Sequence, residues 1–184
     1  MFEFTAHPLA GFRHAAGVTL IELLVTIALL GILSALAAPG FADILRRQRV
    51  ESMREEMTAS LALARVEAIT RGQNVVLLRT TPCTQAKSAL DWDCGWTVFA
   101  DLDGDGAIDV NEPTLHTVQG KPGTRIRRSP VASFATVNRF GRIPFGRIEI
   151  FPAGAGFDAS DGVLLCVSGG GRMRAERGEL ACVP

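Results

Sequence analysis

The sequence has no tyrosine, only two tryptophans and three histidines, and no excess of either charge. Its 184 residues include 19 Lys and Arg against 19 Asp and Glu. This balance excludes a globally basic nucleic-acid-binding protein, so any contact with a polyanion requires a local patch. Glycine (19) and proline (9) are too few and too scattered for a disordered chain. The length allows one modest domain plus one membrane segment.

The neutral total hides an uneven distribution of charge. Residues 83–119 hold one Lys and seven Asp and Glu, whereas residues 120–184 hold ten Lys and Arg and five Asp and Glu. An acidic segment is therefore followed by a basic one. Any patch that binds an anion is expected in the second.

One long apolar run lies near the N-terminus. Residues 18–38 read VTLIELLVTIALLGILSALAA, which at about 1.5 Å per residue spans a hydrocarbon core of about 30 Å. An ordinary secretory signal peptide is the alternative, with Ala35-Leu36-Ala37 as its cleavage site. Glu22 argues against it, because a carboxylate in an inserted helix costs about 2.5–3.5 kcal/mol. The run also exceeds the usual signal length of about 7–15 apolar residues.

The residues around Glu22, GVTLIELL from Gly17 to Leu24, resemble the class III signal of type IV pilins and type II secretion pseudopilins. The resemblance implies cleavage by a prepilin peptidase after Gly17, N-methylation of the new first residue Val18, and an assembly role for Glu22. A buried carboxylate needs a cationic partner, and the free α-amino group of a neighbouring subunit would supply one. The family usually has Phe at the position of Val18.

Arginines around the apolar run give a conflicting orientation. Arg46, Arg47 and Arg49 after it outnumber Arg13 before it, so the positive-inside rule would place the C-terminus in the cytoplasm. The resemblance implies the opposite, a single pass through the bacterial inner membrane with a periplasmic C-terminal head. Four cysteines agree with an exported head, and we therefore expect that orientation.

After the apolar run, apolar residues recur at helical spacing: Met53, Met57, Leu61, Ala64 and Ala68. This pattern predicts an amphipathic helix within residues 40–71, ended by Gly72 as its C-cap. Joined to the apolar run, it makes one long N-terminal helix, bent near Gly31 and Pro39.

Beyond Gly72 the pattern changes to period 2. Short β-rich runs separated by Gly, Pro and Asp predict strands at 74–79, 95–100, 114–118, 147–151 and 162–168. The expected fold class is α+β, with a long N-terminal helix packed on an antiparallel β-sheet head. The order of elements, an acidic turn after Cys94–Asp101 and a final Gly-Arg-x-Arg resemble the FimT/FimU and GspH branch of minor pilins. The resemblance implies the type IV pilin fold.

Four segments are expected along the chain. They are a prepilin leader (1–17), the transmembrane and filament-core half of the helix (18–38), its amphipathic half (39–72) and a β-rich periplasmic head (73–184). The sequence shows no internal repeat and no low-complexity linker, so the head is one domain.

Four cysteines in an exported head favour two disulfides. Of the three connectivities we expect the two local ones, Cys83 with Cys94 and Cys166 with Cys182. Zinc binding is the alternative, but the sequence has no Cys-x-x-Cys pair and no His at ligand spacing from these cysteines.

An acidic segment matches the ligand and glycine positions of an EF-hand calcium loop: Asp101, Asp103, Asp105, Gly106, Ile108, Asp109 and Glu112, with the carbonyl of Ala107. The flanking helices of an EF-hand are missing, because a predicted strand precedes the segment and Pro113 follows it. We therefore expect a solvated acidic hairpin, which the resemblance also implies, and keep Ca²⁺ as the alternative.

The segment Gly171-Arg172-Met173-Arg174 is a Gly-rich turn between Cys166 and Cys182, with Arg177 nearby. It resembles the GRxR element with which FimT-type pilins hold DNA in natural transformation. The resemblance implies double-stranded DNA as a partner, held by guanidinium contacts to phosphates without reading of bases.

Three arginines earlier in the chain, Arg125, Arg127 and Arg128, would extend this basic patch. The alternative is a solvated strand end, in which the C-terminal arginines pair with Glu176 and Glu179.

The pattern of catalytic residue types argues against an enzyme. His7 and His14 lie in the expected leader, and His116 has no partnered Ser or Cys nucleophile. We expect no required cofactor. The expected function is that of a minor pilin in the initiating or tip complex of a type IV pilus, with a minor pseudopilin of type II secretion as the alternative. Expected partners are other minor and major pilins or pseudopilins, prepilin peptidase and the inner membrane.

Overall fold

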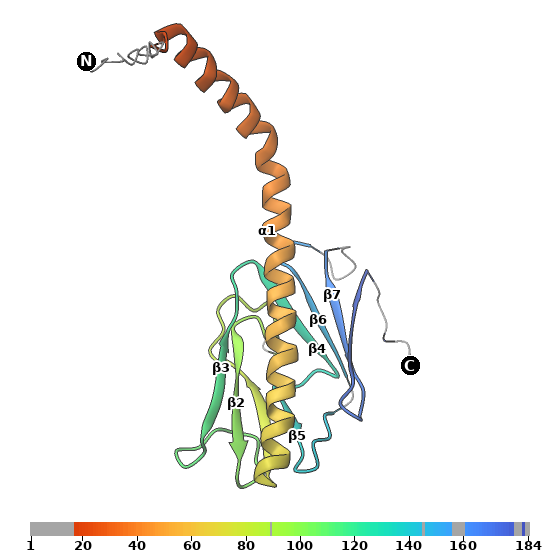
Figure 1. Cartoon of the computed structure of the whole chain (residues 1–184). Helices are drawn as coiled ribbons and strands as arrows, with labels where there is room; N and C mark the ends of the chain where they lie inside the picture. Colours follow the sequence, from red (N-terminus) through yellow and green to blue (C-terminus); the bar gives the residue numbers. More distant parts are fainter. Residues whose placement is uncertain (1–16, 89, 145, 156–160, 179–181, 183–184) are drawn as a thin grey trace, which may run out of the picture. The chain divides into compact units, whose positions relative to one another are not determined.

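The computed structural model describes residues 17–88, 90–144, 146–155, 161–178 and 182 (Figure 1). The chain divides into two compact units, Met1–Phe41 and Ala42–Pro184. The sequence analysis places the boundary between the transmembrane and amphipathic halves of the helix after residue 38, three residues before the boundary between these two units. All of the predicted leader except Gly17 lies outside the described residues.

The helix α1 (Leu20–Arg71) contributes residues to both units. It begins two residues later than predicted, after Thr19. It ends at Arg71. The next residue, Gly72, has a left-handed φ of 66°, and the N–H of Gln73 donates to the Ala68 carbonyl at 3.2 Å. This is the pattern of a Schellman C-cap, so the predicted role of Gly72 is confirmed.

Two four-stranded antiparallel sheets make up the rest of the unit Ala42–Pro184. The first has the order β3-β2-β1-β5, where the strands are β1 (Asn74–Arg79), β2 (Gly95–Asp101), β3 (Thr114–Gln119) and β5 (Phe134–Val137). The second has the order β4-β6-β7-β8, where the strands are β4 (Thr124–Ser129), β6 (Gly146–Pro152), β7 (Val163–Val167) and β8 (Met173–Arg177).

The core lies between α1 and the two sheets, and Figure 1 shows the helix running across both. The buried face of α1 carries Val50, Met53, Met57, Leu61, Ala64 and Ala68, which confirms the predicted apolar face and adds Val50. The strands contribute large buried side chains such as Trp96 and Ile126. The indole N–H of Trp96 donates to the Ser60 hydroxyl at 2.9 Å, so this buried polar pair is satisfied.

All five predicted strands are present, each within one residue of its expected ends. The sequence did not predict β4, β5 or β8, and the strands form two sheets instead of one. The sequence did not predict β4 because its residues TRIRRS are charged. Arg125 and Arg128 are nevertheless buried, Arg125 against Asp91 and Asp93 and Arg128 against the nearby Pro130 carbonyl.

Candidate functional site

The N-terminal end of α1 positions the residues expected for processing and assembly. Thr19 caps the helix, because its Oγ1 accepts a hydrogen bond from the N–H of Glu22 at 3.2 Å. Thr19 and Glu22 have the spacing of a capping box. Glu22 is exposed in the first turn, where the positive end of the helix dipole favours a carboxylate. The Gly17–Val18 bond precedes the helix, and both residues are exposed.

The next turns of α1 expose large apolar side chains throughout: Leu20, Ile21, Leu23, Leu24, Val25, Ile27, Leu29, Leu30, Ile32, Leu33 and Leu36. Nothing in the described part of the chain covers them. Burial of each such side chain contributes about 1.5–3 kcal/mol, so this surface favours lipid or neighbouring subunits over water.

Within the described residues no single helix passes the length and composition test for a membrane span, although Leu20–Leu36 and Gly40–Arg71 together do. The break between them contains Pro39, one of the two predicted bend positions.

The acidic segment forms the loop between β2 and β3. No described helix flanks it, as expected for a hairpin. Its carboxylates accept hydrogen bonds from the loop backbone: Asp101 from Gly104 at 2.7 Å, Asp103 from Asp105 at 3.1 Å and Asp105 from Ala107 at 2.7 Å. The Glu112 carboxylate accepts from the N–H groups of Leu102 at 2.7 Å and Asp109 at 3.1 Å. These bonds close the loop without help from another molecule.

Three carboxylates of this loop, Asp101, Asp103 and Asp105, have oxygens within 4.8 Å of one another. Burial raises the pKa of Asp101; the Gly104 N–H opposes this, and the charges of Glu112, Asp103 and Asp105 add to it. Oxygen ligands at this spacing suit Ca²⁺, but both Glu112 oxygens already accept backbone hydrogen bonds.

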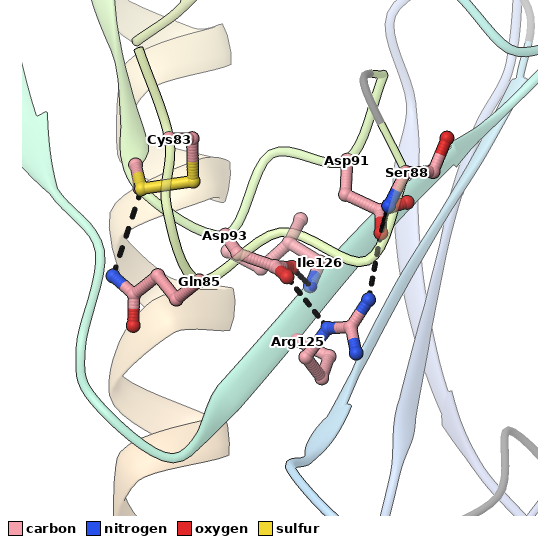
Figure 2. The surroundings of a disulfide bond; sticks show 8 residues. Cys83, Gln85, Ser88, Asp91, Asp93, Arg125 and Ile126 are labelled. Carbon is pink, nitrogen blue, oxygen red and sulfur yellow. Dashed lines mark hydrogen bonds and ion pairs between the residues drawn. A yellow bond between two sulfur atoms is a disulfide. The ribbon is translucent and has the colours of Figure 1, made fainter. Parts of the chain in front are cut away.

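The expected disulfides Cys83–Cys94 and Cys166–Cys182 are both present. The first closes the loop between β1 and β2, and a buried ionic cluster lies beside it (Figure 2). In that cluster Arg125 of β4 contacts Asp91 through Nη2 at 2.6 Å and Asp93 through Nε at 2.5 Å. The other Asp93 oxygen accepts the N–H of Ile126 at 2.6 Å. The cluster thus ties the loop before β2 in one sheet to the edge strand β4 of the other.

The hypothesis that Arg125, Arg127 and Arg128 extend a basic surface patch is wrong for two of the three. Arg125 is 7% exposed and is neutralised by the two aspartates, and Arg128 is 9% exposed and donates to the Pro130 carbonyl at 3.0 Å. Burial lowers the pKa of Arg128. Only Arg127 is exposed, so β4 offers little charge to a ligand.

The three C-terminal arginines singled out by the sequence are all exposed but differ in their partners. Arg174 of β8 pairs with Glu176 at 2.8 Å, as the alternative interpretation expected, and Arg177 pairs with Glu51 of α1 at 2.8 Å. Among the described residues Arg172 has no carboxylate partner; the expected partner Glu179 lies outside them. The backbone N–H of Arg172 donates to the Ser168 hydroxyl at 3.1 Å, which fixes its turn.

Two further arginines, Arg65 and Arg142, were missed by the sequence interpretation, and the first of them lies beside this turn. A Cβ placed on Gly171 would lie 2.5 Å from Nη1 of Arg65, which belongs to α1. A Cβ placed on Gly141 would lie 3.1 Å from Cγ of the same side chain, and Arg142 follows directly. The dipeptide Gly-Arg occurs at Gly141-Arg142, Gly146-Arg147 and Gly171-Arg172, so by itself it does not single out the first turn.

Comparison with known proteins places these features in a family. The sequence profile described as Type II transport protein GspH matches residues 54–174. The chain belongs to this family. The profile of the prokaryotic N-terminal methylation motif matches residues 12–38, which include Gly17, Val18 and Glu22.

A relative of this GspH-family chain, a fimbrial protein of Pseudomonas aeruginosa, is 38% identical over 94 residues, 51% of this chain and 56% of the relative. The chain thus spans about half the length of the curated relatives it matches. The type IV minor pilin FimU of Pseudomonas aeruginosa aligns with a TM-score of 0.56 at 20% identity, over 73% of this chain and 93% of FimU. The minor pseudopilin EpsH of the Vibrio cholerae type II secretion system aligns with a TM-score of 0.53 at 14% identity, over 72% and 99%.

These structural likenesses show the α+β type IV pilin fold. The two family profiles add that the chain belongs to the GspH family and carries the prokaryotic N-terminal methylation motif.

Proposed function

We propose that this GspH-family chain is a minor pilin of a type IV pilus, processed after Gly17 and incorporated through the first half of α1. The supporting observation is the start of α1, where Glu22 follows the Thr19 cap and precedes an apolar surface that no described part of the chain covers. The exposed carboxylate has no cationic partner among the described residues, and a neighbouring subunit's α-amino group would provide one.

The assembly role is tested in a gene-deletion strain complemented with the full chain or with Glu22→Ala. We expect the variant to reach the membrane but to fall about tenfold or more in sheared pili, because a charge-assisted hydrogen bond contributes about 1.5–3 kcal/mol. Glu55→Ala, which removes an exposed carboxylate elsewhere on α1, is the matched control. Incorporation of both variants at the wild-type level would contradict the proposal.

Processing is tested by mass spectrometry of the mature protein, whose first residue should be N-methylated Val18. Gly17→Val should retain the leader and be absent from pili.

The choice of a pilus over a secretion system rests on the fimbrial relative. Deletion of the gene should reduce surface pili and leave type II secretion intact. The reverse result would make the chain a minor pseudopilin, the function that the family's description favours.

We also propose that the head binds double-stranded DNA through phosphate contacts. Arg172 supports this, because its guanidinium is exposed and has no carboxylate partner among the described residues. Binding by the wild-type head that weakens as salt increases would support the proposal. No binding even at low salt would leave a purely structural subunit.

A further inference from the structure

Two turns in the head have the same hydrogen-bond pattern. In Asn138–Arg142, the Asn138 N–H donates to the Arg142 carbonyl at 3.1 Å, the Gly141 N–H to the Asn138 carbonyl at 2.8 Å, and the Arg142 N–H to the Asn138 side-chain oxygen at 3.0 Å. In Ser168–Arg172, the equivalent distances are 2.9 Å, 2.8 Å and 3.1 Å, with the Ser168 hydroxyl as the side-chain acceptor. Each turn therefore holds an arginine directly after a left-handed glycine.

Arg65 of α1 lies against both turns. Its Cγ is next to Gly141 and its guanidinium is next to Gly171, so close that a Cβ on either glycine would crowd the Arg65 side chain. The two glycines have φ values of 72° and 81°, which a residue with a side chain adopts only at a cost. Any larger residue at position 171 would also displace the Arg65 guanidinium. The turns that carry Arg142 and Arg172 thus both pack against Arg65, which brings three arginines from three separate segments into one region of the head.

The charge at this point is uncompensated within the described residues. None of Arg65, Arg142 and Arg172 forms an ion pair there, and their side chains have no other polar partner in that part of the chain. Arg174 and Arg177, by contrast, each have a carboxylate at 2.8 Å. Since a paired arginine adds little net charge, the positive potential of this surface comes from the first three.

We propose that Arg65, Arg142 and Arg172 form a single phosphate-binding surface for double-stranded DNA, and that Arg174 and Arg177 lie outside it. This inference rests on the proposed DNA-binding function. Of the Gly-Arg-x-Arg segment it keeps only Arg172 in the binding surface, and it adds Arg65 and Arg142 from other segments. Guanidinium groups match phosphate oxygens in geometry and charge. The two turns and the helix hold the backbones of all three arginines in place, so less conformational entropy is lost when DNA binds.

The test measures duplex DNA binding by the unit Ala42–Pro184, which contains the entire core, across a salt series. Three variants, Arg65→Met, Arg142→Gln and Arg172→Gln, should each weaken binding roughly tenfold at about 50 mM salt. Each should also reduce the salt slope, which is the slope of the logarithm of the binding constant against the logarithm of the salt concentration, by about 0.9. Arg174→Gln and Arg177→Gln are the matched controls, because they remove exposed but paired arginines, and should change the affinity less than about twofold. Arg65→Lys keeps the charge and should retain most of the slope.

The failures of the inference and of the DNA-binding proposal are distinguishable. If the wild-type head binds no DNA at low salt, both are wrong. If it binds, and the Arg174 and Arg177 variants lose affinity as much as or more than the others, only the inference is overturned. Thermal unfolding of each variant identifies any loss of folding; Arg142→Gln alters only an exposed side chain and remains decisive if Arg65→Met is unstable.

Discussion

At the scale of single residues, Arg125 joins two parts of the head that are far apart in sequence. Its guanidinium bonds to Asp91 and Asp93, and the Asp93 carboxylate also accepts the backbone N–H of Ile126. Two carboxylates and one guanidinium are buried together, so loss of the cation would leave uncompensated charge in a medium of low polarity. Burial already raises the pKa of Asp93, with the Ile126 N–H and Arg125 opposing the shift.

Arg125→Met should therefore destabilise the head by about 3–5 kcal/mol, the range for breaking a buried ion pair by removing one partner. Urea unfolding of the purified head measures the change. Arg127→Met, at the exposed neighbouring position on β4, is the control and should stay within about 0.5 kcal/mol of wild type. Equal stability of the two variants would mean that the cluster contributes no net stability.

The buried carboxyl of Asp101 is expected to make the free energy of unfolding of the head depend on pH. Because its pKa is raised in the folded head, the folded state binds this proton more tightly than the unfolded chain does. Its contribution to the free energy of unfolding therefore falls as pH rises from about 4 through the raised pKa. Asp101→Asn keeps an acceptor for the Gly104 N–H and removes the charge, so its stability should fall less between about pH 4 and pH 7.

Urea unfolding at a series of pH values measures this difference. The control is Asp43→Asn, which alters an exposed carboxylate of α1 and should keep the wild-type profile. A variant profile that falls as steeply as that of wild type would show that Asp101 does not cause the pH dependence.

At the scale of elements, the sequence predicts those whose apolar pattern matches their burial. The face of α1 from Met53 to Ala68 and the strand β1 are examples, because each packs apolar side chains on one core. β4 and β8 could not be predicted in this way. Arg125 of β4 pairs with Asp91 in the loop before β2, and Arg177 of β8 pairs with Glu51 of α1. Such pairings depend on the tertiary fold.

The same limit applies to the candidate site. Gly17, Val18 and Glu22 could be identified because they form one contiguous motif. Arg65 could not, because it becomes part of the arginine surface only when two turns, 30 residues apart, pack against one helix.

The hairpin between β2 and β3 makes a further prediction. Both Glu112 oxygens already accept hydrogen bonds, from the backbone N–H groups of Leu102 and Asp109, so the chain itself holds the two ends of the loop together. We expect the melting temperature of the head to be the same with millimolar Ca²⁺ and with chelator. A rise with Ca²⁺ that depends on its concentration, and that is lost in Asp103→Asn, would establish the calcium site instead.

At the scale of the whole molecule, the two compact units differ in how they are stabilised. The unit Ala42–Pro184 contains every buried apolar residue of the core and both disulfides. The large apolar side chains of the other described helical stretch are exposed within the chain. We therefore expect the head to fold on its own, whereas the apolar surface of the N-terminal half of α1 requires other surroundings than water.

Removal of residues 1–41 should accordingly leave the melting temperature of the head within a few degrees of the full chain in detergent. Differential scanning calorimetry of both proteins measures it. Met57→Ala in the truncated head is the positive control, because it creates a cavity in the core and should cost about 2–5 kcal/mol. A large drop on truncation alone would show that the N-terminal half stabilises the head.

The continuity of α1 has a mechanical consequence. The helical residues Leu20–Arg71 belong to one element, whose stretch Gly40–Arg71 leads into the core of the head. Tension applied along the part of α1 that belongs to the unit Ala42–Pro184 would load its buried residues from Val50 to Ala68 in shear. Shear loads many side-chain contacts simultaneously, whereas peeling breaks them one after another. The head is thus attached to its helix in a geometry that resists pulling along the helix axis.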